Sequence, residues 1–158
     1  MPANEKIVAR REEMGITDVE AAKGIDMGLD AYCDVEWHED EIYTCVDLEH
    51  IKKICDFFKF DFFELFDMKC AFCEKGRPYL DEYLLPRNLL MKKCREESEM
   101  DFESYGDAIN ITDMGIREFE NDPKEFEIYT FDQIKDMVSV VDVPIQLLLD
   151  VKCSKCGR

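Results

Sequence analysis

Hydrophobic residues in the first half of the chain recur at the three- and four-residue spacing of amphipathic α-helices. The spacing predicts five short helices, in residues 4–15, 17–25, 28–36, 47–60 and 61–66. Thr17 is followed by Glu20 three residues later, as in a capping box at a helix start, and Asp47 is expected to cap the fourth helix. Because an alternation of strands with helices is absent, the pattern favours an all-α fold.

The pattern of the first half returns in the second half. The segments LFDMKCAFC and LLDVKCSKC end in the same C-x-x-C motif, and placing Cys70 on Cys153 also aligns the apolar positions that precede the two motifs. Nearer the N-terminus the match continues in an alignment shifted by one position, which places Arg11 on Arg95. One residue was therefore gained or lost within this part of the repeat, where the polar segment WHEDEIY of the first half is aligned with NDPKEF of the second. We interpret the chain as a tandem duplication.

Two tandem five-helix units joined by a linker are expected from this repeat. The first unit takes residues 1–73, the linker residues 74–85 and the second unit residues 86–158. The linker contains Gly and Pro, which interrupt regular structure. The helices of the second unit are expected to start near Pro86, Asp101, Thr112, Thr130 and Val143.

Each unit resembles the Cro/CI-type helix-turn-helix domain of lambda-repressor-like (XRE-like) regulators. The resemblance is carried by RREEMGITDVEAAKGIDMG and LEHIKKICDFFKFDFFELF in the first unit, and by CREESEMDFESYGDAINIT and FDQIKDMVSVVDVPIQLLL in the second. The family's Leu-Ala positions hold Ala21-Ala22 and Tyr105-Gly106, and the Glu that ends its third helix corresponds to Glu36 and Glu120. The resemblance covers nearly the whole chain and implies that the third helix of each unit corresponds to the DNA-reading helix.

The third helices depart from DNA-reading relatives, which carry Gln, Ser, Arg, Asn or Lys on this surface. The corresponding residues are Gly28, Leu29, Asp30, Cys33 and Asp34 in the first unit and Thr112, Asp113, Met114, Arg117 and Glu118 in the second. Because carboxylates repel phosphates, DNA is an unlikely partner on this pattern. The alternative is a transcriptional regulator whose second unit still contacts DNA through Arg117 and Lys124.

The overall charge of the chain also disfavours DNA as a partner. The chain carries 37 acidic and 20 basic residues, a formal net charge of −17. A field of this sign repels nucleic acids and anionic membranes and attracts basic proteins. The sequence shows no signal-peptide pattern and no apolar run of membrane-spanning length, so we expect a cytoplasmic protein with reduced thiols and no membrane partner.

Two C-x-x-C motifs, Cys70 with Cys73 and Cys153 with Cys156, have the spacing with which cysteine pairs bind zinc. Together they supply the four thiolates of a tetrahedral Zn²⁺ site that would join the two units. Basic residues that offset the charge of such a site are Lys69, Lys75, Lys152, Lys155 and Arg158. A thiol–disulfide redox pair is the alternative, although the strand and helix pattern of thioredoxin-like proteins is absent.

The sequence contains no motif of a nucleophile, a phosphate-binding loop or an open catalytic metal site, so we expect a binding protein and not an enzyme. Our hypothesis is an acidic immunity protein or antitoxin that neutralises a basic toxin by direct binding. The predicted partner surface consists of Asp30, Asp34, Glu36, Trp37, His38, Glu39 and Asp40. An exposed aromatic beside acidic residues is a typical interface anchor, whereas the oligomeric state stays open.

Overall fold

The computed structural model describes residues 1–75 and 85–157, and within them the protein is all-α, as predicted. The helices of the first half (1–75) are α1 (Ala3–Glu13), α2 (Asp18–Gly24), α3 (Leu29–Trp37), α4 (Glu41–Thr44), α5 (Leu48–Phe58), α6 (Phe62–Leu65) and α7 (Ala71–Lys75). Those of the second half (85–157) are α8 (Arg87–Glu97), α9 (Phe102–Ile109), α10 (Asp113–Asn121), the 3-10 helix η2 (Pro123–Ile128), α11 (Phe131–Ser139) and α12 (Ile145–Leu149). Most of the predicted linker, residues 76–84, lies outside the described residues.

Side-chain caps start several helices where the sequence predicts them. Thr17 and Glu20 form the capping box of α2, and the Asp47 carboxylate accepts a hydrogen bond from the backbone of His50 at the start of α5. A second capping box, between Thr130 and Gln133, begins α11. Each cap satisfies backbone N–H groups that the helix itself leaves without a partner.

The two halves repeat their helix bounds. In the alignment of the N-terminal parts of the repeat, both ends of α1 coincide with those of α8, and both ends of α3 coincide with those of α10. In the alignment of the C-x-x-C motifs, α5 and α11 begin at equivalent positions. Left-handed backbone conformations also recur at equivalent positions, since Asp26 matches Asn110 and Asp67 matches Asp150. The one-residue slip therefore falls between the third helix and α5 or α11, in the segment where the sequence predicts it.

That segment differs from expectation because it is helical. The sequence predicts a polar loop after the third helix, but the structure contains the short helix α4 in the first half and η2 in the second. Each turns one apolar side chain fully into the core, Ile42 from α4 and Phe126 from η2. Burying that side chain stabilises a helical turn that the surrounding polar residues conceal in the sequence.

Equivalent ion pairs tie the first helix to the third in each half. Arg11 makes two hydrogen bonds to the Glu36 carboxylate, at 2.6 and 3.0 Å, and Arg95 makes two to Glu120, at 2.7 and 3.1 Å. These paired contacts between a guanidinium and a carboxylate have the strong bidentate geometry. The repeat in the sequence is thus matched by a repeat of specific interactions.

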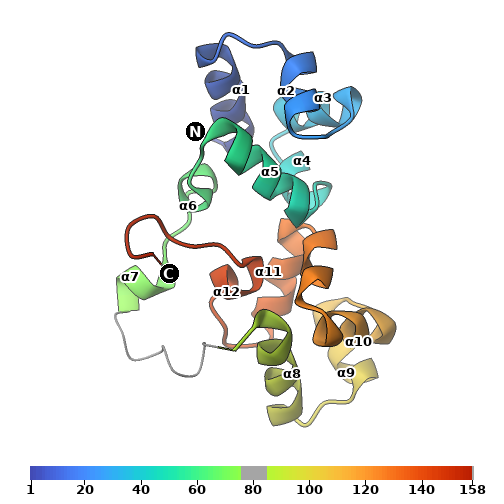
Figure 1. Ribbon diagram of the computed structural model, residues 1–158. Helices are drawn as coiled ribbons and strands as arrows, with labels where there is room; N and C mark the ends of the chain where they lie inside the picture. The colour runs from blue at the N-terminus through green and yellow to red at the C-terminus, as the bar shows by residue number, and fades with distance from the viewer. Residues whose placement is uncertain (76–84, 158) are drawn as a thin grey trace.

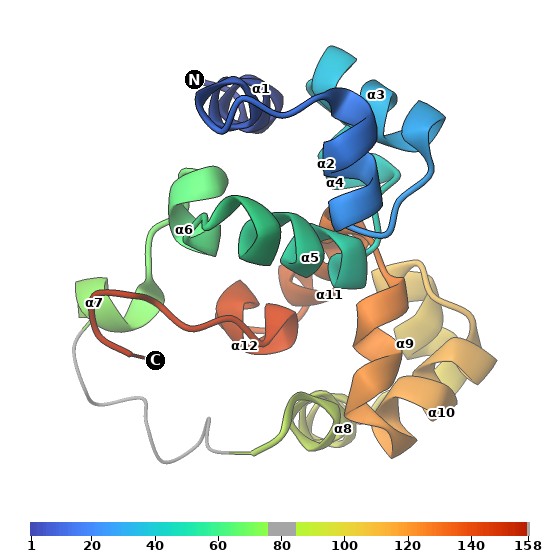
Figure 2. The same ribbon diagram turned by 45° about the horizontal axis from the view of Figure 1, so that its top comes forward.

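Figure 1 shows α1 to α3 at one end of the molecule and α8 to α10 at the other, with α5 and α11 between them; Figure 2 shows the same arrangement. The contacts between the halves are reciprocal: an element of the first half packs on the second half as its equivalent in the second half packs on the first. Asp47 and Thr130, which are equivalent positions, form an antiparallel bridge, and α4 packs on α11 as η2 packs on α5. These reciprocal contacts describe an approximate twofold relation between the halves.

One hydrophobic core runs through both halves. The ring of Phe131 stacks on that of Phe66 with centroids 4.9 Å apart, and Tyr43 contacts Phe131 edge-on at 5.5 Å. A partly buried ion-pair network also joins the halves, in which the Glu127 carboxylate accepts hydrogen bonds of 2.7 Å from both Lys52 and Arg87. None of the described helices has the length and apolar character needed to cross a membrane.

Candidate metal centre

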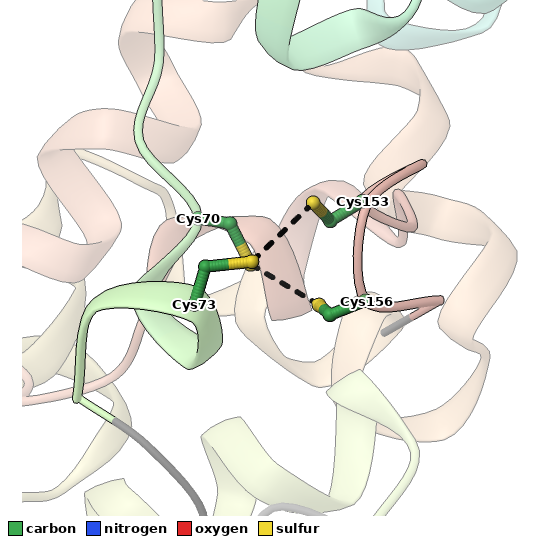
Figure 3. Close-up of side chains that lie close together, drawn as sticks. All are labelled: Cys70, Cys73, Cys153 and Cys156. Atoms are coloured by element: carbon green, nitrogen blue, oxygen red, sulfur yellow. Dashed lines mark hydrogen bonds between the residues drawn. The ribbon is translucent and has the colours of Figure 1, made fainter.

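The C-x-x-C motifs follow α6 in the first half and α12 in the second, where α7 and the C-terminal segment come together (Figures 1 and 2). Cys70 directly precedes α7 and Cys73 lies within it, whereas Cys153 and Cys156 stand in a turn after α12. The four side chains point towards one another (Figure 3). We call these residues the four-cysteine cluster.

The sulfur positions fit a four-coordinate metal ion. The Sγ atoms of Cys70 and Cys156 are 3.7 Å apart, those of Cys73 and Cys153 are 3.8 Å apart, and all four lie within 4.8 Å of one another. A tetrahedron with metal–sulfur bonds of about 2.3 Å has edges of about 3.8 Å. The cluster can therefore hold a metal ion with little movement of its side chains.

Two sulfur contacts cross between the halves, Cys70 with Cys156 and Cys73 with Cys153. Because Cys70 corresponds to Cys153 and Cys73 corresponds to Cys156 in the repeat, each of these contacts is the equivalent of the other. The approximate twofold relation of the α5 and α11 contacts thus extends to the cluster. Two motifs that lie far apart in the sequence meet because the halves pack in this way.

One polar side chain holds each motif against the opposite half, and neither residue was predicted from the sequence. Gln146 of α12 accepts a hydrogen bond from the Ala71 backbone at 2.9 Å and donates one to the Cys70 sulfur at 3.5 Å. Asp61 accepts a hydrogen bond from the Ser154 backbone at 3.2 Å. Gln146 has a recognisable signal, since it is the single polar residue in the apolar run 145–149 and only 2% of its surface is exposed.

The surroundings of the cluster favour unequal protonation of its thiols. Burial raises the pKa of Cys70, but hydrogen bonds from the backbone of Cys73 and Phe72 and from Gln146 lower it to about 7. The sulfur of Cys156, burial and the sulfur of Cys153 together raise the pKa of Cys73 to about 12. Four adjacent thiolates repel one another, so all four can be ionised together only when a cation lies between them.

Three of the predicted basic residues have described side chains, and each is a sequence neighbour of a cluster cysteine. Lys152 and Lys155 are exposed, and Lys69 is paired with Glu74 at 3.3 Å. The side chains of Lys75 and Arg158 lie outside the described residues. An open cavity of about 630 Å³ adjoins the cluster and is lined by residues of both motifs.

The predicted partner surface is exposed apart from two of its members. Asp30, Trp37, His38, Glu39 and Asp40 are exposed, with 71% of the Trp37 surface accessible, and Asp34 is half-buried. The prediction that Glu36 belongs to the partner surface was wrong, because only 7% of its side chain is exposed and both carboxylate oxygens bind Arg11. Glu36 stabilises the contact between α1 and α3 and is not free to meet a partner.

The basic residues of the alternative DNA-contact hypothesis are both exposed in the second half. The Arg117 guanidinium lies over the Phe102 ring at 4.1 Å, on the same ring that Arg95 contacts at 4.1 Å. Lys124 lies at the start of η2. Stacking on Phe102 restrains Arg117, but the guanidinium remains open to solvent.

We expect Gln146→Leu to weaken metal binding about 10- to 100-fold, because the substitution removes a hydrogen bond to a ligand sulfur and leaves the Ala71 N–H without its acceptor. The free energy of unfolding of the metal-free protein should fall by about 1 to 3 kcal/mol. Competitive chelator titration and chemical denaturation measure the two effects.

Gln133→Leu is a matched control, since it removes a capping hydrogen bond at the start of α11. It should lower stability without changing metal affinity. Equal metal affinities of Gln146→Leu and wild type would show that Gln146 does not position the cluster.

Comparison with known proteins finds no matching family model, no matching curated protein and no matching solved structure.

Proposed function

We propose that this chain is a non-enzymatic, acidic protein-binding module that neutralises a basic partner, most specifically an immunity protein or antitoxin acting on a basic toxin. The observation that carries the proposal is the exposure of Trp37 beside exposed carboxylates in a chain of net charge −17. A large aromatic side chain with 71% of its surface accessible gains much by burial in a partner. The carboxylates select the sign of that partner's charge.

The placement of the acidic residues supports one continuous surface around Trp37. Asp30 lies in the first turn of α3 and Trp37 is its last residue, whereas Glu39 and Asp40 follow directly in the chain. Leu29 is also partly exposed at the start of the same helix. We define the α3 surface as Leu29, Asp30, Asp34, Trp37, Glu39 and Asp40, which combines apolar anchors with negative charge.

The fold belongs to the same proposal. In it, each half is a degenerate lambda-repressor-like helix-turn-helix unit, with α2 and α3 as the helix pair of the first half and α9 and α10 as that of the second. Support comes from the matching helix bounds and from the equivalent Arg11–Glu36 and Arg95–Glu120 pairs. The α3 surface then takes the place of the DNA-reading surface and presents acidic and apolar side chains there.

The cofactor in this proposal is one structural Zn²⁺ ion held by the four-cysteine cluster. Four thiolates form a closed tetrahedral set that leaves no coordination position for a substrate, which is the arrangement of structural zinc sites. The ion would join the ends of the two halves. It would thereby stabilise the relative orientation that the contacts of α5 and α11 set. This role fits a binding module better than a catalytic one.

A DNA-binding regulator is the second candidate, and the exposed Arg117 on α10 favours it. Arg117 is accompanied on α10 by Asp113 and Glu118, both exposed carboxylates. A single guanidinium flanked by carboxylates contributes little attraction to a phosphate backbone, which most DNA-binding proteins contact several times. The acidic binding module therefore remains the first proposal.

The proposed function is tested by capturing partners from the source cells on the immobilised full-length chain, and we expect the captured protein to be basic. With the purified partner, Asp30→Lys combined with Asp34→Lys should lower the association rate about 10-fold or more at low salt, because steering depends on charge. Trp37→Ala should mainly raise the dissociation rate. Surface plasmon resonance over a range of salt concentrations measures both rates.

Two controls match these variants elsewhere on the molecule. Glu103→Lys with Asp107→Lys makes the same charge change on exposed positions of α9, and Met114→Ala truncates a side chain that is 66% exposed on α10. Equal effects of the test and control variants would remove the α3 surface from the interface. Salt-dependent binding of random duplex DNA that is lost in Arg117→Ala would put the regulator in first place.

A further inference from the structure

The four-cysteine cluster has a buried side and an exposed side. Cys70 and Cys153 are 7% and 4% exposed and pack with Phe63 in a small apolar cluster, whereas Cys73 and Cys156 are exposed. The open cavity of about 630 Å³ reaches the sulfur-bearing residues from the surface. Small oxidants in solution can therefore contact the cluster, which a fully enclosed structural site would prevent.

The sulfur contacts pair the exposed side with the buried side. Cys156 is 3.7 Å from the buried Cys70, and Cys73 is 3.8 Å from the buried Cys153 (Figure 3). Each pair thus contains one exposed thiol and one buried thiol. In a two-cysteine oxidation site, the sulfenic acid that forms on one thiol is attacked by the other.

We propose that the four-cysteine cluster is a site of reversible oxidation, in which a peroxide-class oxidant forms the crossed disulfides Cys70–Cys156 and Cys73–Cys153 and releases the metal ion. The part of this proposal that concerns metal release rests on the zinc site proposed above. The crossed pairing itself requires only the four thiols.

The chemistry balances with two equivalents of peroxide. In each pair one thiolate attacks the peroxide O–O bond, which gives a sulfenic acid and releases hydroxide, and the second thiolate then displaces the sulfenic oxygen to form the S–S bond. Four thiolates lose four electrons, two peroxide molecules accept them, and four protons from solvent complete four water molecules. The metal ion leaves as Zn²⁺ because no thiolate ligand remains.

Crossed disulfides would keep the two halves tied together. Each joins the segment at α7 to the segment after α12, which are the segments that the metal ion joins. Disulfide formation within a C-x-x-C motif would instead leave these segments without a covalent link. Closing each crossed pair to a bond of about 2.05 Å requires the sulfurs to approach by less than about 2 Å, which side-chain rotation can provide.

The test treats the zinc-loaded full-length protein with hydrogen peroxide and follows metal release with a chromogenic chelator. We expect complete loss of the bound zinc at about two equivalents of peroxide, with a mass decrease of about four units for four lost hydrogens. Peptide mapping without reduction should recover peptides that link Cys70 to Cys156 and Cys73 to Cys153. Treatment with dithiothreitol and fresh zinc should restore the starting metal content.

Substitutions decide between the two pairing patterns. In Cys156→Ser, crossed pairing leaves Cys70 as a free thiol and joins Cys73 to Cys153, whereas pairing within the motifs joins Cys70 to Cys73. Cys45→Ser, an exposed cysteine outside the cluster, should leave the mapped disulfides and the metal release unchanged. Pairing within the motifs, or zinc that stays bound in excess peroxide, would overturn the proposal.

The failure of the zinc proposal is distinguishable from the failure of this one. If the purified chain binds no zinc, the reduced, metal-free protein is oxidised and mapped in the same way. Crossed disulfides in that experiment would support the oxidation site without a metal ion. Their absence would overturn the crossed pairing independently of the metal content.

Discussion

The protein purified under reducing conditions will contain about one zinc ion per chain, and removal of that ion by a chelator will lower the melting temperature by roughly 10 °C. The stoichiometry follows from four thiolates that complete one tetrahedral site. A ligand present at about a thousand times its dissociation constant stabilises the folded state by about 4 kcal/mol, and each kcal/mol shifts the melting temperature by about 2 to 4 °C in a domain of this size. Elemental analysis and differential scanning calorimetry provide the two readings.

The zinc prediction has a direct control in the choice of cysteine. Cys70→Ser removes one ligand and should abolish both the stoichiometric metal and the sensitivity to chelator, whereas Cys45→Ser should preserve both. The metal should also be lost as the pH falls, because protons compete with zinc for the thiolates. Metal-free protein with a melting temperature that is unchanged in Cys70→Ser would exclude a structural zinc site.

Glu36→Gln and Glu120→Gln will each lower the free energy of unfolding by about 3 to 5 kcal/mol, because each leaves a largely buried guanidinium without its carboxylate. Because Glu36 binds Arg11 in the same geometry as Glu120 binds Arg95, we expect the two substitutions to lower the free energy of unfolding by similar amounts. Denaturant titration with a two-state fit measures them. In the folded Glu36→Gln protein, the association rate with a basic partner should stay that of wild type.

Glu13→Gln is the matched control for these substitutions. Glu13 pairs with Arg10 at 3.2 Å on the surface of α1, and exposed pairs of this kind contribute about 0 to 1 kcal/mol. The double replacement Arg11→Met with Glu36→Gln should cost less than Glu36→Gln alone, since no buried charge is left unpaired. A loss in Glu36→Gln no larger than in Glu13→Gln would contradict the structural role that its burial indicates.

Local sequence determined most of the helical segments and where several of them begin. The apolar spacing of 47–60 places Ile51, Ile54 and Phe58 on one face of α5, and all three are fully buried. Thr17 and Asp47 cap the helices that follow them because their side-chain oxygens accept backbone N–H bonds. These features depend on residues within one or two turns, so they can be read along the chain.

The repeat was also a property of the sequence. The two alignments that relate the halves in the sequence also relate their helix bounds, because the same spacing of apolar and capping residues produces the same helices. The short helices α4 and η2 were missed, since one buried side chain in each, Ile42 or Phe126, is too little to reveal a helical period.

The meeting of the four cysteines was decided by tertiary packing. A C-x-x-C motif specifies two sulfurs, but the second pair arrives only because α5 and α11 pack with α4 and η2 in reciprocal contacts. The orientation of Glu36 was decided in the same way: its position at the end of α3 suggested an exposed acid, and the approach of α1 brought Arg11 onto it. Sequence spacing fixes which face of a helix is apolar, whereas contacts between distant segments depend on how those faces fit together in three dimensions.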